Sequence, residues 1–95
     1  MQSAERERRL GTPVISRFYG IIIRMYFQQA EHNPPHIHAI YGEDVAVISI
    51  QTCEVLEGSL PPKASAMVNE WIRNNKNELL SMWETQQFRK LSPLE

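Results

Sequence analysis

The sequence lacks several features that would define a function class at once. Its one cysteine in 95 residues, Cys53, excludes an internal disulfide and the paired cysteines of a structural zinc site. No apolar run approaches the roughly 20 residues needed to cross a bilayer, and no apolar segment follows the charged start as in an export signal. Ten basic against eleven acidic residues leave a net charge of -1, too little for strong non-specific nucleic-acid binding. We therefore expect a cytoplasmic protein without a membrane anchor.

The length predicts one domain with one modest core. Residues 1–12 mix charges of both signs and contain a single large apolar side chain, Leu10. Such a segment buries too little apolar surface to offset its ordering entropy, so we expect a flexible N-terminal extension. Apolar composition begins after Pro13, and residues 13–95 are predicted to form a single α+β domain.

Segments rich in β-branched and aromatic residues, joined by short turns, predict an antiparallel sheet. Alternate residues from Ile21 to Phe27 are apolar and share one face of a strand, whereas Arg24 lies on the other. Gly20 is expected to bend the chain and to separate a short segment, 14–18, from this strand. Further strands are predicted at 36–41, 45–50 and 55–60. The expected sheet is a four-stranded β-meander, with or without a short extra N-terminal strand.

The period of the apolar residues changes after Leu60-Pro61-Pro62. The next apolar positions have the three-four spacing of a helix: Ala64, Met67, Val68, Trp71 and Ile72. Asn74-Asn75 interrupts this pattern, and Asn75 with Glu78 resembles a capping pair for a second helix. The fold prediction is therefore a meander followed by two C-terminal helices packed on one face of the sheet.

All three histidines lie within residues 31–38, around the double proline Pro34-Pro35. Neutral imidazole is a common ligand of transition metals, so His32, His36 and His38 are candidate metal ligands. A complete site would need another ligand, for which the candidates are Glu31, Glu43 and Asp44. The alternative, which we favour, is that the histidines are ordinary exposed side chains that hydrogen-bond the loop. No cofactor is assigned on this pattern.

A second use of the histidines is proton transfer. His36 and His38 are two residues apart in a predicted strand, so they share a face and could act as general acid and base. Arg17 or Arg24 could hold a phosphate, which would complete the minimum apparatus of a metal-independent ribonuclease. The same residues could equally form a solvated polar face. The sequence leaves open whether the protein is an enzyme.

The third interpretation of the histidines, and the leading hypothesis, is that they belong to a binding module for a protein partner or a nucleic acid. The candidate binding residues lie in the histidine loop and on neighbouring strands: Arg17, Tyr19, His32, Asn33, His36, His38 and Tyr41. The tyrosines could stack on bases, and an exposed edge of the sheet could pair with a second copy of the chain.

Several motifs, taken together, resemble the bacterial family called domain of unknown function 4160. They are Ile15-Ser16-Arg17-Phe18-Tyr19-Gly20-Ile21, His32-Asn33-Pro34-Pro35-His36-Ile37-His38-Ala39, Tyr41-Gly42, Leu60-Pro61-Pro62, Glu70-Trp71, and Glu78-Leu79-Leu80 with Trp83. The resemblance covers residues 13–95. It implies a small cytosolic protein that is often encoded beside another small protein, in a toxin-antitoxin-like arrangement, and it implies no established activity.

Two departures from the family pattern bear on the fold. Residues 1–12 lie outside it, because members usually begin near Pro13. Cys53 stands where the family generally has the glycine of a Thr-Gly-Glu turn. A cysteine there either abolishes a turn with positive φ or strains it by about 1 kcal/mol or more.

Overall fold

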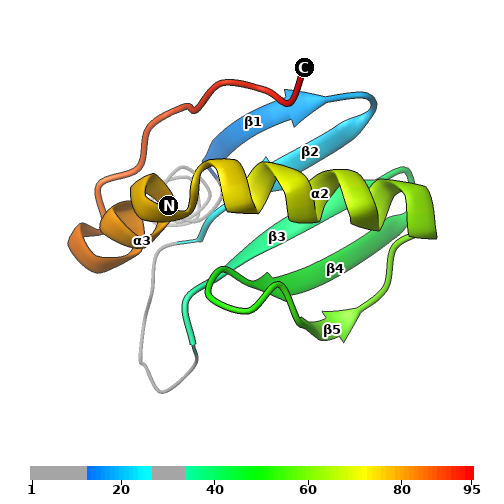
Figure 1. Cartoon of the computed structure of the whole chain (residues 1–95), viewed down its shortest axis with the longest axis horizontal. Coiled ribbons are helices and arrows are strands. Elements are labelled where there is room, and N and C mark those ends of the chain that lie inside the picture. Colours follow the sequence, from blue (N-terminus) through cyan, green and yellow to red (C-terminus); the bar gives the residue numbers. More distant parts are fainter. Residues whose placement is uncertain (1–12, 27–33) are drawn as a thin grey trace, which may run out of the picture.

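The computed structural model describes residues 13–26 and 34–95, which form one antiparallel sheet with two helices (Figure 1). The sheet has five strands in the order β1-β2-β3-β4-β5, so each strand pairs with its neighbour in sequence. The elements are β1 (Val14–Phe18), β2 (Ile21–Arg24), β3 (His36–Tyr41), β4 (Asp44–Ser49), β5 (Val55–Gly58), α2 (Pro62–Asn74) and α3 (Lys76–Thr85). The expected α+β meander is confirmed, and the short N-terminal segment is a full fifth strand.

A two-residue turn joins β1 to β2. Tyr19 and Gly20 have φ values of 49° and 82°, and the flanking residues Phe18 and Ile21 pair with each other. Positive φ at both central residues is typical of the tight turns that match the twist of a hairpin. Gly20 therefore bends the chain as expected.

One face of the sheet forms the core together with the helices. Ile21, Ile23 and Met25 are fully buried, as their period of two predicts. They pack with inward-facing residues of the other strands and with Trp71 of α2, whose ring lies 5.7 Å from that of Phe18. Figure 1 shows α2 lying across this face of the sheet.

The helices begin and end close to the predicted positions. α2 has proline in its first turn, where the missing amide proton costs no intrahelical hydrogen bond. The predicted capping pair at α3 is wrong, because Asn75 makes no side-chain cap. Its Nδ2 instead donates to the carbonyl of Trp71 in α2, and Glu78 pairs with Arg89 of the C-terminal segment.

The two edges of the sheet differ. The segment after α3 runs back to the β1 edge, where the Leu91 amide donates to the Ile15 carbonyl at 2.8 Å. Trp71 Nε1 donates to the Ser92 carbonyl at 2.8 Å and holds the same segment. In the described part of the chain no strand pairs with the outer side of β5. All four β5 residues are exposed, and the sheet therefore has one covered and one open edge.

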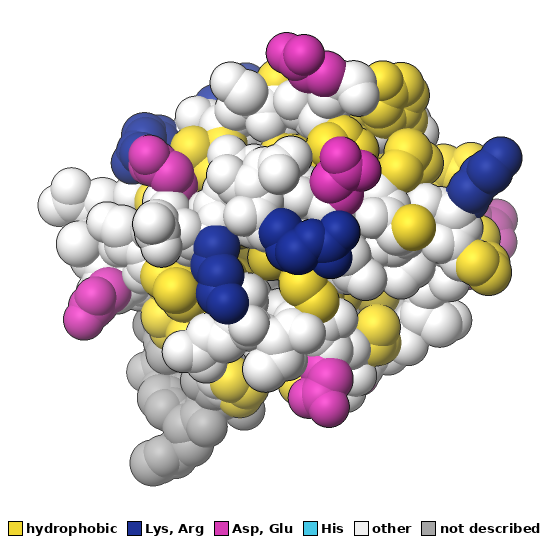
Figure 2. Space-filling view, in the orientation of Figure 1, with side chains coloured by type: hydrophobic (Ala, Val, Ile, Leu, Met, Phe, Trp, Pro, Cys, Tyr) yellow, Lys and Arg dark blue, Asp and Glu magenta, His cyan; other side chains and the backbone are white. Residues whose placement is uncertain are grey.

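The face opposite α2 is called here the outer face. Strand register places Arg17, Ile22, Arg24, His36, His38, Ile40, Val45, Val47 and Glu57 on it. The helix side is drawn in Figure 2, and none of the side chains coloured there is a histidine. Among the described residues, no helix is both long and apolar enough to span a bilayer.

Candidate functional site

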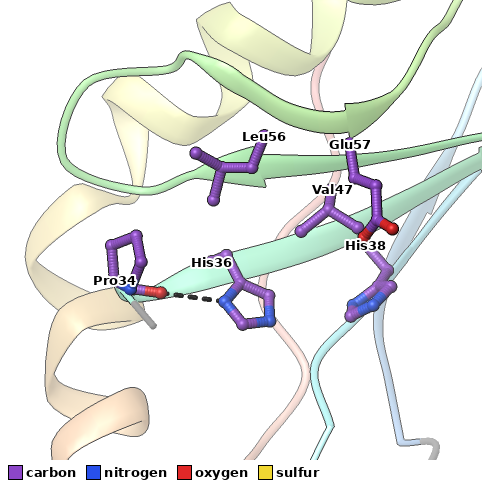
Figure 3. A pocket seen from close by; sticks show the side chains of 6 residues that line it. All are labelled: Pro34, His36, His38, Val47, Leu56 and Glu57. Carbon is purple, nitrogen blue, oxygen red and sulfur yellow. Dashed lines mark hydrogen bonds between the residues drawn. The ribbon is translucent and has the colours of Figure 1, made fainter. Parts of the chain in front are cut away.

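A cleft on the outer face brings together side chains from β3, β4 and β5 (Figure 3). It has a volume of about 310 Å³. Its walls are formed by Pro34, His36, His38, Val47, Leu56 and Glu57. Because His36 and His38 are two apart on β3, both rings project from the same side of that strand, as the spacing predicts. The cleft therefore contains three groups that can transfer protons.

His36 is held in one orientation by the chain that precedes it. Its Nδ1 lies 2.8 Å from the carbonyl oxygen of Pro34. A carbonyl can only accept, so Nδ1 carries the proton and Nε2 is the nitrogen that remains for other chemistry. The Trp83 ring of α3 lies 4.8 Å from the imidazole and limits its movement. The proline ring restricts the backbone at Pro34, so the carbonyl that accepts from His36 has little freedom to move.

His38 lies deeper in the sheet than His36. Its Nδ1 is buried and has no hydrogen-bond partner among the described residues. Tyr26 lies against the ring, with centroids 4.2 Å apart. Desolvation by burial lowers the pKa of His38 below its ordinary value; His36 lowers the pKa further, whereas the Glu57 carboxylate opposes both. His38 is consequently neutral at neutral pH.

Glu57 is a lining residue of the cleft that the sequence analysis did not single out. His38 pairs with Val47, and Val47 pairs with Glu57, so the three share one cross-strand row. Figure 3 shows the carboxylate of Glu57 directed from β5 toward the side of the cleft that holds His38. Only the register between β4 and β5 could have revealed this neighbour.

The two candidate arginines are both on the outer face but at different distances from the cleft. Arg24 pairs with His38 across β2 and β3, which places their Cβ atoms roughly 4.5–5.5 Å apart. Arg17, on β1, pairs with Ile22 of β2 and so lies one cross-strand row away from the row that contains Arg24 and His38. Of the two, Arg24 is the cation next to the histidines.

The candidate tyrosines are not brought to the cleft. Tyr19 is in the β1–β2 turn and is 60% exposed. Tyr41 is five residues beyond His36 on β3, so its side chain projects to the opposite face at the other end of the strand. Tyr26 is the tyrosine that contacts a histidine.

The described residues offer no complete metal site. No three of their histidine, cysteine, aspartate and glutamate side chains are close enough together to hold an ion. Asp44 pairs with Tyr41 at the far end of the β3–β4 hairpin, next to Glu43, so neither supplements His36 and His38. His32, Asn33 and Glu31, which were further candidate ligands or binding residues, lie outside the described residues.

The turn at Cys53 has the positive φ that a glycine would favour. The φ of Cys53 is 65°, in the left-handed region, and its amide donates to the Ser49 carbonyl at 2.9 Å. The turn with positive φ is therefore present, and the side chain strains it by about 1 kcal/mol or more. The cysteine is partly buried against the core.

The family model for a domain of unknown function (DUF4160) matches residues 20–84, which is more than half of the chain. The chain belongs to the DUF4160 family. The match includes every lining residue of the cleft, so the cleft lies within the DUF4160 domain. No curated protein and no solved structure matches the chain.

Proposed function

We propose that this DUF4160 protein is a cytoplasmic bacterial binding module that acts with a partner protein, in a toxin-antitoxin-like two-protein system. The single observation that carries the proposal is the open β5 edge. Its four residues are all exposed, whereas the C-terminal segment occupies the β1 edge. Unpaired backbone groups at such an edge can accept a strand from another chain.

Apolar side chains next to the open edge support the same surface. Val55 and Leu56 on β5 are 46% and 42% exposed, and Val45 on β4 is 45% exposed. Exposed large apolar groups beside an unpaired strand are costly in water unless another surface covers them. A partner strand on β5 would cover Leu56, and an adjoining part of the partner would reach Val45.

The test is co-purification with the product of the adjacent gene, followed by titration of the purified pair. Wild type should form a complex at micromolar concentration. Val45→Arg and Leu56→Arg should each weaken it at least tenfold, because each places a charge where an apolar contact forms. Tyr19→Arg is the matched control, since Tyr19 is exposed but lies in the turn at the other side of the sheet.

Two outcomes would contradict the proposal. One is the absence of a complex between the wild-type proteins at micromolar concentration. The other is equal affinity of all three variants, which would move the interface away from β5. Thermal unfolding of each variant separates lost binding from lost folding.

A further inference from the structure

The cleft contains groups for proton transfer, and its lining residues include no alcohol or thiol. Its lining consists of two histidines, one carboxylate and three apolar residues, with no hydroxyl or thiol. A substrate that brings its own nucleophile would need only the general acid and base that this lining provides. A glycosidase would need two carboxylates, and this lining provides one.

The neighbouring residues favour an anionic substrate with flat rings. Arg24 is the cross-strand neighbour of His38, and a guanidinium is suited to phosphate recognition. Tyr26 and Trp83 flank the two imidazoles at 4.2 and 4.8 Å. Aromatic rings beside a phosphate site are typical of single-stranded nucleic-acid binding, in which bases stack on side chains. RNA has both properties and also has its own nucleophile, the 2′-hydroxyl.

We propose that this cleft cleaves single-stranded RNA, with His38 as general base and His36 as general acid. His38 takes the proton of a 2′-hydroxyl, whose oxygen attacks the adjacent phosphorus. The bond from phosphorus to the 5′-oxygen breaks, and His36 gives a proton to that oxygen through Nε2. The products are a 2′,3′-cyclic phosphate and a 5′-hydroxyl, and no water or redox partner is consumed.

The geometry suits these two roles. The ring centroids of His36 and His38 are 5.4 Å apart, so one phosphate lying beside both rings can place a different oxygen near each. The carbonyl of Pro34 keeps His36 Nδ1 protonated whether Nε2 has lost or kept its proton. His38 enters the reaction neutral because burial lowers its pKa, so it can accept a proton at neutral pH.

Glu57 acts as a positioning residue in this scheme. It stabilises the positive charge that His38 gains when it accepts the proton, and it raises the pKa of His38 against the effects of burial and of His36. Among the described residues, the cross-strand neighbour of His38 on β2 is a further charged group, Arg24. Removal of Glu57 should therefore move the acid limb of the pH–rate profile to lower pH and should reduce the rate.

The inference does not depend on the proposed partner protein, and the experiment uses the free chain. Purified protein is incubated with a single-stranded RNA oligonucleotide in EDTA, and the products are identified by mass spectrometry. Wild type should yield 2′,3′-cyclic phosphate ends. The same oligonucleotide with 2′-deoxy sugars should remain intact, because the internal nucleophile is missing.

Variants assign the roles. His36→Asn and His38→Asn should each reduce cleavage by about 100-fold or more, the range for loss of a general acid or base. Glu57→Gln should shift the acid limb to lower pH. Glu54→Gln is the matched control; Glu54 is an exposed carboxylate outside the cleft lining and its loss should change nothing.

Several results would overturn the inference. They are no cleavage by wild type in EDTA, equal cleavage by wild type and both histidine variants, and cleavage of the 2′-deoxy substrate. Circular dichroism of each variant separates an unfolded protein from an inactive one. If a histidine variant fails to fold, the Glu57→Gln profile and the 2′-deoxy substrate still decide the outcome.

Discussion

At the scale of single residues, His38 is the group whose ionisation depends most directly on the sheet around it. We expect NMR titration to give His38 a pKa below its ordinary value of 6.5, because burial and His36 both disfavour the charged ring. Glu57→Gln should lower this pKa further, since the carboxylate is the group that raises it. His36→Asn should raise it. A shift in the opposite direction for either variant would contradict this electrostatic account.

The same shift affects stability. The unfolded chain would bind the His38 proton near its ordinary pKa of 6.5, whereas the folded chain binds it only at lower pH. The unfolded state therefore holds more protons in this window, and the contribution of His38 to the free energy of unfolding falls as the pH drops below 6.5. It stops falling once the pH is below the folded pKa.

Two glycines with positive φ provide a matched pair of substitutions. Gly58 has φ of 75°, and an added Cβ would lie 2.0 Å from the Val45 carbonyl oxygen. Gly42 has φ of 63° and open space around it. Gly42→Ala should cost about 1–2 kcal/mol from φ alone, whereas Gly58→Ala should cost roughly 3 kcal/mol or more because β5 must also move.

Urea denaturation of the two glycine variants measures this difference. Gly58→Ala should also disturb the cleft, because Glu57 precedes Gly58 on β5. Equal losses of stability in the two variants would show that β5 moves away from β4 without cost.

At the scale of elements, the C-terminal segment is expected to contribute through both its backbone and its side chains. Leu91→Ala removes a partly buried side chain that packs on the core and should cost about 1–2 kcal/mol. Leu91→Pro also removes the amide that donates to Ile15, and should cost about 1 kcal/mol more. Chemical denaturation compares the two variants. An identical cost would mean that this hydrogen bond adds nothing to stability.

The spacing of apolar residues in the sequence predicted those elements in which buried side chains recur at a regular interval. α2 follows its helical period closely, and the buried positions Ile21 and Ile23 of β2 continue with the same period to Met25, just after the strand. β1 was harder to predict, because a register shift between Val14 and Ser16 leaves Ile15 and Ser16 both buried. Alternation fails at such a bulge. The capping pair was predicted wrongly for a different reason. The local motif at Asn75 suggested a cap for α3, but the Asn75 side chain forms a hydrogen bond with α2 instead.

At the scale of the whole molecule, the sequence predicted the half of the site that lies on one strand. The spacing of His36 and His38 is local, so their shared face could be predicted. Glu57 reaches the cleft through pairings that span β3, β4 and β5 and include a second register shift, between Val47 and Ile48. Such pairings are set by turns and packing, which residue spacing does not encode.

The difference between the two sheet edges also limits how copies of the chain could assemble. Two copies could pair their β5 strands about a twofold axis, and the resulting ten-stranded sheet would end on both sides at a β1 edge that Leu91 already occupies. A third copy that paired with β1 would then have to displace the bond between Leu91 and Ile15. Self-association through this sheet would stop at a dimer, and the C-terminal segment would act as a terminator of fibre growth.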